Sequence, residues 1–116
     1  MRKNGNRLRM IERLYNFTIS QEKTIEKIVD DENLVIGHAV LTKNAEIPGH
    51  HTMSNVYVII VKGQASVEVD EEEPKVLNQG TIFKVPYNTK LRISNDSNEI
   101  TEIFIVRAPN ILEQEK

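Results

Sequence analysis

The stretch of residues 44–63 constrains the fold more than any other part of the chain. It begins as a polar segment with a Pro-Gly turn at Pro48, followed by the adjacent His50 and His51. It continues as an unbroken apolar run rich in Val and Ile, residues 56–61, which a lysine and a glycine end. A short apolar run bounded by turn residues predicts a strand that is buried on both faces. The two histidines are therefore expected at the mouth of a strand that enters a core.

Short apolar segments of the same kind recur along the chain, and clusters of Gly, Pro, Asn, Asp and Ser separate them. Turn signals at intervals of roughly eight to ten residues are typical of an all-β sandwich or barrel. No segment has the apolar periodicity of an amphipathic helix. The predicted strands are residues 14–18 (an edge strand), 24–29, 34–42, 56–61, 65–69, 75–77, 81–85, 91–94 and 100–106.

Length and composition restrict the class of protein. A chain of 116 residues is expected to form one domain. The absence of cysteine excludes a disulfide framework and thiolate metal sites. No apolar run approaches the roughly 18 residues that a membrane-spanning helix needs, and no apolar stretch follows the basic start as in a signal peptide, so a cytoplasmic location is expected. The net charge of -2 argues against nucleic acid as the main partner.

The expected domain covers residues 10–110, with a flexible basic tail at residues 1–9 and a C-terminal tail at residues 111–116. The first nine residues carry four lysines or arginines and no acidic residue. Such a segment is expected to be solvated, and an arm that binds nucleic acid is the alternative. Met10 is an alternative start of the chain, which would make residues 1–9 an upstream extension.

The central stretch resembles the first sequence motif of the cupin family. That motif has G, five residues, H, one residue, H, three or four residues, E, six residues and G. In the same register this chain has Asn44, His50, Thr52, Val56 and Gly63.

A later segment resembles the second cupin motif, which has G, five residues, P, one residue, G, two residues, H, three residues and N. In the same register this chain has Gly80, Pro86, Asn88, Leu91 and Asn95. At Asn88, and at the first position of the first motif, asparagine stands where the family has glycine. Asparagine is the best substitute where the backbone needs a positive φ.

The resemblance covers residues 34–106 and implies a double-stranded β-helix, or jelly roll, with a ligand cavity inside the barrel. In metal-binding cupins, the two histidines and the glutamate of the first motif and the histidine of the second hold the metal. Only His50 occupies a ligand position here, because the others are Thr52, Val56 and Leu91. Valine and leucine cannot bind a metal, and a threonine hydroxyl is a poor ligand for a transition metal. The resemblance therefore predicts a degenerate metal site and no cofactor.

A rearranged site for a divalent metal is the alternative. His38 from the preceding strand, the adjacent His51 and the carboxylate of Glu46 could join His50. Each histidine also has a simpler interpretation, with His38 as a hydrogen-bonded residue of the sheet, His50 as a hydrogen-bonded histidine at the rim and His51 as an exposed loop residue.

Strand alternation divides the central apolar run between two faces. One face shares the side of His50 and is expected to line an apolar cavity together with side chains from neighbouring strands. The opposite face carries Tyr57, Ile59 and Val61 and needs to be covered, either by the chain termini or by a second subunit. A homodimer is predicted. The expected cavity residues are Val56, Val58, Ile60, Phe83, Val85 and Leu91.

The predicted function is the binding of a small, partly apolar molecule in the barrel, with His50 as its polar anchor. Two kinds of enzyme are alternatives. One is a metal-dependent isomerase, dioxygenase or decarboxylase with a non-standard histidine site, and the other is a metal-free, sugar-modifying enzyme that uses His50 as an acid or base. A purely structural or interaction role is a further alternative. The predicted ligand-binding residues are His50, Thr52, His38, Val56, Leu91 and Phe83.

Overall fold

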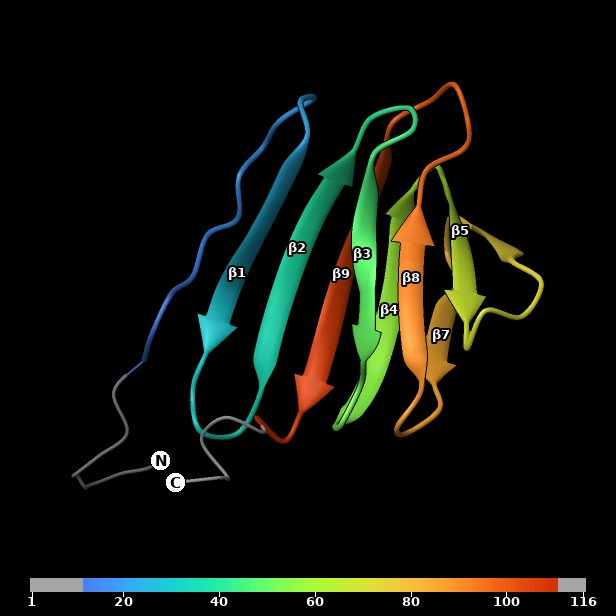
Figure 1. Ribbon diagram of the computed structural model, residues 1–116. Coiled ribbons are helices and arrows are strands. Elements are labelled where there is room, and N and C mark those ends of the chain that lie inside the picture. Colours follow the sequence, from blue (N-terminus) through green and yellow to red (C-terminus); the bar gives the residue numbers. More distant parts are fainter. Residues whose placement is uncertain (1–11, 111–116) are drawn as a thin grey trace.

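The computed structural model describes residues 12–110, with every side chain in this range except that of His50. Both predicted tails, residues 1–9 and 111–116, lie outside this range. Residues 12–110 form nine strands and no helix (Figure 1), so they hold no helix able to cross a membrane. The strands are β1 (Thr24–Asp30), β2 (Val35–Leu41), β3 (Glu46–His51), β4 (Asn55–Lys62), β5 (Gln64–Val69), β6 (Lys75–Asn78), β7 (Ile82–Val85), β8 (Lys90–Ser94) and β9 (Thr101–Ala108).

The strands form two antiparallel sheets that face each other. The five-stranded sheet has the order β1-β2-β9-β4-β7, and the four-stranded sheet has the order β3-β8-β5-β6. Figure 1 shows the four-stranded sheet in front of the other. The chain passes repeatedly from one sheet to the other, so strands far apart in sequence, such as β2 and β9, become neighbours. This arrangement confirms the predicted all-β double-stranded β-helix.

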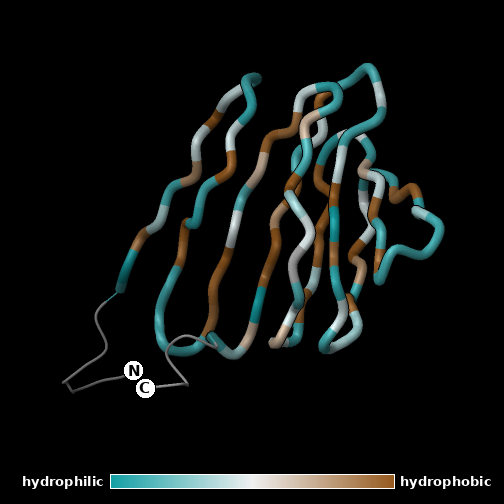
Figure 2. Tube along the Cα trace, viewed as in Figure 1, coloured by the Kyte–Doolittle hydropathy of each residue, from teal (hydrophilic) through white to brown (hydrophobic). Residues whose placement is uncertain are grey.

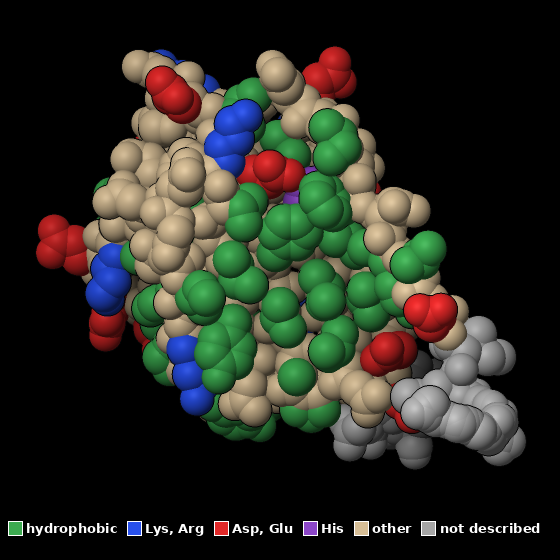
Figure 3. All heavy atoms as spheres, turned by 180° about the vertical axis from the view of Figure 1, so that it is seen from behind, with side chains coloured by type: hydrophobic (Ala, Val, Ile, Leu, Met, Phe, Trp, Pro, Cys, Tyr) green, Lys and Arg blue, Asp and Glu red, His purple; other side chains and the backbone are tan. Residues whose placement is uncertain are grey.

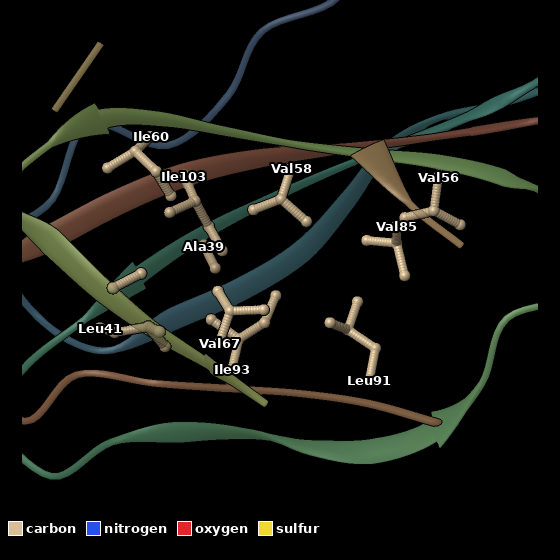
Figure 4. Close-up of a cluster of buried hydrophobic side chains, with 11 residues drawn as sticks. Ala39, Leu41, Val56, Val58, Ile60, Val67, Val85, Leu91, Ile93 and Ile103 are labelled. Carbon is tan, nitrogen blue, oxygen red and sulfur yellow. The ribbon is translucent and has the colours of Figure 1, made fainter. Parts of the chain in front are cut away.

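The core lies between the two sheets, and β4 shows how the alternation of side chains builds it. Val56, Val58 and Ile60 are at most 1% exposed and face inward, whereas Tyr57 is 38% and Val61 40% exposed on the other face. The prediction that this strand is buried on both faces is therefore wrong for a single chain. Figure 2 shows the hydrophobic segments along the strands and hydrophilic ones in the turns. The core cluster (Figure 4) comprises Ala39, Leu41, Val56, Val58, Ile60, Ala65, Val67, Val85, Leu91, Ile93 and Ile103.

Four motif positions have the positive φ that the resemblance implies. The φ angles are 69° at Asn44, 72° at Gly63, 92° at Gly80 and 59° at Asn88. Glycine and asparagine adopt this left-handed conformation at least cost. The interpretation that asparagine replaces glycine at two turns is confirmed.

Asn95, the last residue of the second motif, holds a turn together from inside the protein. Its side chain is fully buried, and its Nδ2 donates to the carbonyl oxygens of Leu41 at 2.8 Å and Glu99 at 2.7 Å. Its Oδ1 accepts from the backbone N–H of Ser97 at 2.9 Å. A buried amide with its polar atoms satisfied in this way joins the end of β2 to the β8–β9 turn.

Two parts of the secondary structure differ from the prediction. Residues 14–18 do not form an edge strand, since Leu14 is 93% exposed and this segment is attached by side-chain contacts instead of a β-ladder. The polar segment at Pro48 belongs to β3 rather than to a turn. Its pairing with β8 shifts register between Ile47 and His50, and such a bulge accommodates a proline within a strand.

Candidate functional site

Three of the four ligand positions that the cupin resemblance assigns meet inside the barrel. Thr52, Val56 and Leu91 line a single internal cavity of about 10 Å³. His50 is paired with Leu91 through the β3–β8 ladder, although its side chain lies outside the described part of the structure. The motif register is therefore correct in three dimensions. The cavity has room for about one water molecule, so the barrel is filled with side chains at this point.

The hydroxyl of Thr52 is directed at the loop between β7 and β8. Its Oγ1 lies 3.2 Å from the carbonyl oxygen of Pro86 and 3.3 Å from that of Thr89, and Thr52 is only 3% exposed. One hydroxyl proton serves both acceptors. Thr52 thus stabilises the loop.

Phe83, one of the predicted cavity residues, lies on β7 opposite Val58 and packs against the core cluster. It contributes to packing and lines neither the internal cavity nor the groove described next.

A larger groove opens beside the internal cavity, between β3 and the inner face of β1, β2 and β9. Its volume is about 240 Å³. It shares Ile47, Ile105 and Arg107 with the internal cavity, so the two spaces adjoin. Glu26 and His38 border it through their backbone, because their side chains point to the other face of the sheet. The side chains available to a ligand are those of Ile25, Lys27, Ala39, Ile47, Ile105 and Arg107.

Gly37 leaves the floor of this groove bare. It lies between Lys27 on β1 and Ile105 on β9 in the ladders. A Cβ atom added there would meet only the backbone oxygens of Glu26 at 3.6 Å and Ile105 at 3.9 Å, which is ordinary contact. The position can therefore take a side chain, and that side chain would fill part of the groove.

Arg107 brings a positive charge to the wall that separates the groove from the internal cavity. It is half-buried on the inner face of β9, where its ladder neighbours are Val35 and Val56. Within residues 12–110, its guanidinium group has no ion pair and no hydrogen bond. The sequence prediction missed this residue because it ended the last strand at residue 106. Continuing the alternation from Ile103 and Ile105 would have placed Arg107 on the inner face.

The structure does not bring His38 to the cavity. Its ring lies on the outer face of β2, where it contacts the rings of Phe17 and Phe104 at centroid distances of 4.7 and 4.9 Å, and these two rings also contact each other. Nδ1 is 2.7 Å from a carboxylate oxygen of Glu26, and Nε2 is 2.7 Å from one of Glu102. The side chain is fully buried. The predicted role in ligand binding is replaced by that of a hydrogen-bonded histidine in the sheet.

Glu26 attaches the segment before β1 to this histidine. The backbone N–H and the hydroxyl of Thr18 both donate to its carboxylate, at 2.8 and 2.9 Å. These contacts, the Thr18 N–H first and then the His38 hydrogen bond, lower the pKa of Glu26. A carboxyl group whose pKa is lower in the folded state stabilises that state above its unfolded pKa, and the stabilisation is lost as the pH falls through the folded value.

We therefore expect that, as the pH is lowered, the segment of residues 12–20 detaches from the sheet before the barrel unfolds. NMR spectra recorded from pH 6 downward should show the Thr18 amide signal moving with a midpoint below the usual glutamate pKa of about 4.3. In Glu26→Gln the same signal should be insensitive to pH in this range. A midpoint at or above the usual value would contradict the assigned contacts.

The residues proposed for a rearranged metal site lie on different surfaces. Glu46 is on the outer face of the four-stranded sheet, where it pairs with Arg92, and His51 is exposed. His38 is on the outer face of the other sheet, and its two nitrogens point at carboxylates on opposite sides of the ring. No group of three or more His, Asp or Glu side chains among the described residues is arranged to hold a metal ion.

Comparison with known proteins agrees with the fold. No protein-family model matches the chain. An uncharacterised protein of Methanocaldococcus jannaschii is 37% identical over 102 residues, which cover 87% of this chain and 88% of the relative. The crystal structure of that protein, an RmlC-like cupin family protein with a double-stranded β-helix fold, has a TM-score of 0.85 at 35% identity. The match covers 92% of this chain and 99% of the other.

More distant solved structures show the same fold. The cupin domain of Cnp3 from Schizosaccharomyces pombe has a TM-score of 0.70 at 19% identity, with 85% of this chain and 73% of that one covered. A cupin superfamily protein of Desulfitobacterium hafniense has a TM-score of 0.67 at 10% identity, with 80% and 83% covered. The motif register, the double-stranded β-helix and the identity to the archaeal relative together place this chain in the cupin family.

Proposed function

We propose that this cupin binds a small, partly apolar molecule in the groove between β3 and the inner face of β1, β2 and β9. The supporting observation is the groove itself, which has mostly apolar walls and adjoins the cavity at the motif positions. Ligand sites are typically concave and apolar with a few polar groups. The volume of about 240 Å³ is below the range of about 300–1,000 Å³ for drug-sized ligands, so the ligand is small.

This proposal moves the binding site from the barrel interior to its open side. Thr52, Val56 and Leu91 fill the interior and form the closed end beside the groove. The ligand would instead contact the side chains of Ile25, Ile47 and Ile105.

A valine at Gly37 tests the proposal by filling the groove. The added Cβ meets no clash, and a β-branched side chain suits a strand, so Gly37→Val should fold with a melting temperature close to that of the wild type. Native mass spectrometry of the protein as purified should show a bound small molecule in the wild type and its loss in Gly37→Val. Ser66→Val, on β5 outside the groove, is the matched control and should keep the ligand. Retention of the ligand by Gly37→Val would place the site elsewhere.

We also propose that the site works without a bound metal. Of the four motif ligand positions, Thr52, Val56 and Leu91 offer no strong ligand, and an unpaired divalent charge among apolar side chains carries a high desolvation cost. Elemental analysis of untagged protein should find no stoichiometric zinc, iron, manganese or nickel. About one metal ion per chain, lost in His50→Ala, would overturn this proposal and favour the metal-dependent enzyme.

A further inference from the structure

We propose that the ligand of the groove is a small organic anion, whose carboxylate binds Arg107 and whose apolar body lies against Ile25 and Ile105. This inference rests on the proposed function and adds the chemical class of the ligand. Three observations carry it: the state of the Arg107 side chain, the balance of charge around the groove, and the chemistry of its walls.

The first observation is a guanidinium group without a partner. Arg107 is half-buried, and no described carboxylate or carbonyl group is bonded to its side chain. Arg92, on the outer face of the four-stranded sheet, provides the contrast, since it pairs with Glu46 and lies 3.5 Å from Glu68. Removing polar groups from water without a hydrogen bond is unfavourable. A guanidinium group presents its donors as a planar fork that fits a carboxylate with two parallel hydrogen bonds.

The second observation is the balance of charge. The side chains that line the groove include two cations, Arg107 and Lys27. Asp30 pairs with Lys27 at 3.4 Å and also accepts a 2.7 Å hydrogen bond from Asn110. It therefore compensates the charge of Lys27, whereas the charge of Arg107 has no described partner. The carboxylate of Glu26 is held on the opposite face of the sheet by His38. The groove therefore favours an anion over a neutral or cationic molecule.

The third observation, the chemistry of the walls, indicates that the part of the ligand beyond its carboxylate is apolar. Apart from the two cations, the walls consist of Ile25, Ala39, Ile47 and Ile105, with the bare backbone of Gly37 between them. The internal cavity on the other side of Arg107, at about 10 Å³, admits no more than one water molecule. A ligand that reaches Arg107 must therefore extend outward along the apolar walls. Inorganic phosphate would satisfy the charge but leave these walls uncovered.

The ligand class can be tested on the wild-type protein with three probes of one size. Chemical-shift titrations with hexanoate, hexanol and hexylammonium compare an anion, a neutral molecule and a cation with the same apolar body, and inorganic phosphate serves as an anion without such a body. Hexanoate should shift the amide signals of Gly37, Ile105 and Arg107 and bind at least about tenfold more tightly than the others, as expected for a charge-assisted pair.

Substitutions then identify the anchor. Arg107→Gln should reduce hexanoate affinity about tenfold or more and leave hexanol unaffected, whereas Arg107→Lys should keep part of the preference. Arg92→Gln makes the same change outside the groove and should bind hexanoate like the wild type. Thermal melting checks that each variant is folded.

The outcomes separate this inference from the proposed function. Equal binding of hexanol and hexanoate, both abolished by Gly37→Val, would overturn the anion and keep the groove as a site. Binding of phosphate as tight as that of hexanoate would overturn the apolar body. The C-terminal residues 111–116 carry two carboxylates of their own, Glu113 and Glu115. If hexanoate binds only to the double variant Glu113→Gln/Glu115→Gln, a carboxylate of the chain itself is the partner of Arg107, and the inference is overturned. If no probe binds, both proposals fail.

Discussion

Gly63→Ala is expected to destabilise the barrel severely. Gly63 connects β4 to β5 with a φ of 72°, a conformation that costs an alanine about 1–2 kcal/mol. The new Cβ would also press against the carbonyl oxygen of Ile100 and lie 3.2 Å from its carbonyl carbon and from the Cα of Thr101. These are backbone atoms at the start of β9, so they cannot move aside as a flexible side chain would. Overpacking of this kind costs typically about 1–3 kcal/mol more.

Gly80→Ala is the matched control, because it shares the backbone problem and lacks the steric one. Its φ is 92°, and an added Cβ would have nothing within 4 Å. Urea denaturation should show a moderate loss of unfolding free energy for Gly80→Ala and a loss at least about twice as large for Gly63→Ala. Equal losses would show that the contact with Ile100 relaxes freely. The pair would thereby separate the two reasons for which the cupin motifs require glycine.

The elements that could be predicted from the sequence are those determined by local physics. A positive φ is a property of one residue and its turn, so Asn44 and Asn88 can be recognised as substitutes for glycine from their motif positions alone. The inward side of residues 56–61 follows from alternation. The strand β3 was missed because a Pro-Gly pair predicts a turn locally, and only its pairing with β8 shows that a bulge absorbs the proline.

The site was harder to predict because it depends on how the strands lie across the sheets. Thr52, Val56 and Leu91 come together as their motif positions predict. His38 does not join them, since the pairing of β2 with β9 turns Ala39 inward and His38 outward. Nothing within residues 34–42 distinguishes the two directions. The groove depends on β1, which pairs with β2 and contributes Ile25 and Lys27 to one wall.

The second large effect that we expect is the dissociation of a homodimer, and it follows from the outer face of the five-stranded sheet. Figure 3 views this face and shows hydrophobic side chains gathered over most of it, with few charges between them. Tyr57 is 38%, Val61 40% and Ile82 64% exposed in the single chain. Contiguous apolar surface of this kind marks an interaction site, and a two-fold dimer is the commonest way to cover it. We expect a homodimer in which each chain buries this face.

Ile59→Lys should convert that dimer into a monomer. Ile59 lies on this face between Ile82 on β7 and Phe104 on β9, with which it is paired. Burying apolar surface contributes about 25 cal/mol per Å², and a specific interface covers about 800 Å² per partner. A lysine at this position would remove part of this gain and would place two like charges near each other across the two-fold axis, since both chains carry it.

Light scattering at tens of micromolar protein should give twice the chain mass for the wild type and the chain mass for the variant Ile59→Lys. Val76→Lys, at a position 59% exposed on β6 of the other sheet, should stay dimeric. A monomeric wild type, or a dimer that survives Ile59→Lys and dissociates in Val76→Lys, would assign this apolar face a different role.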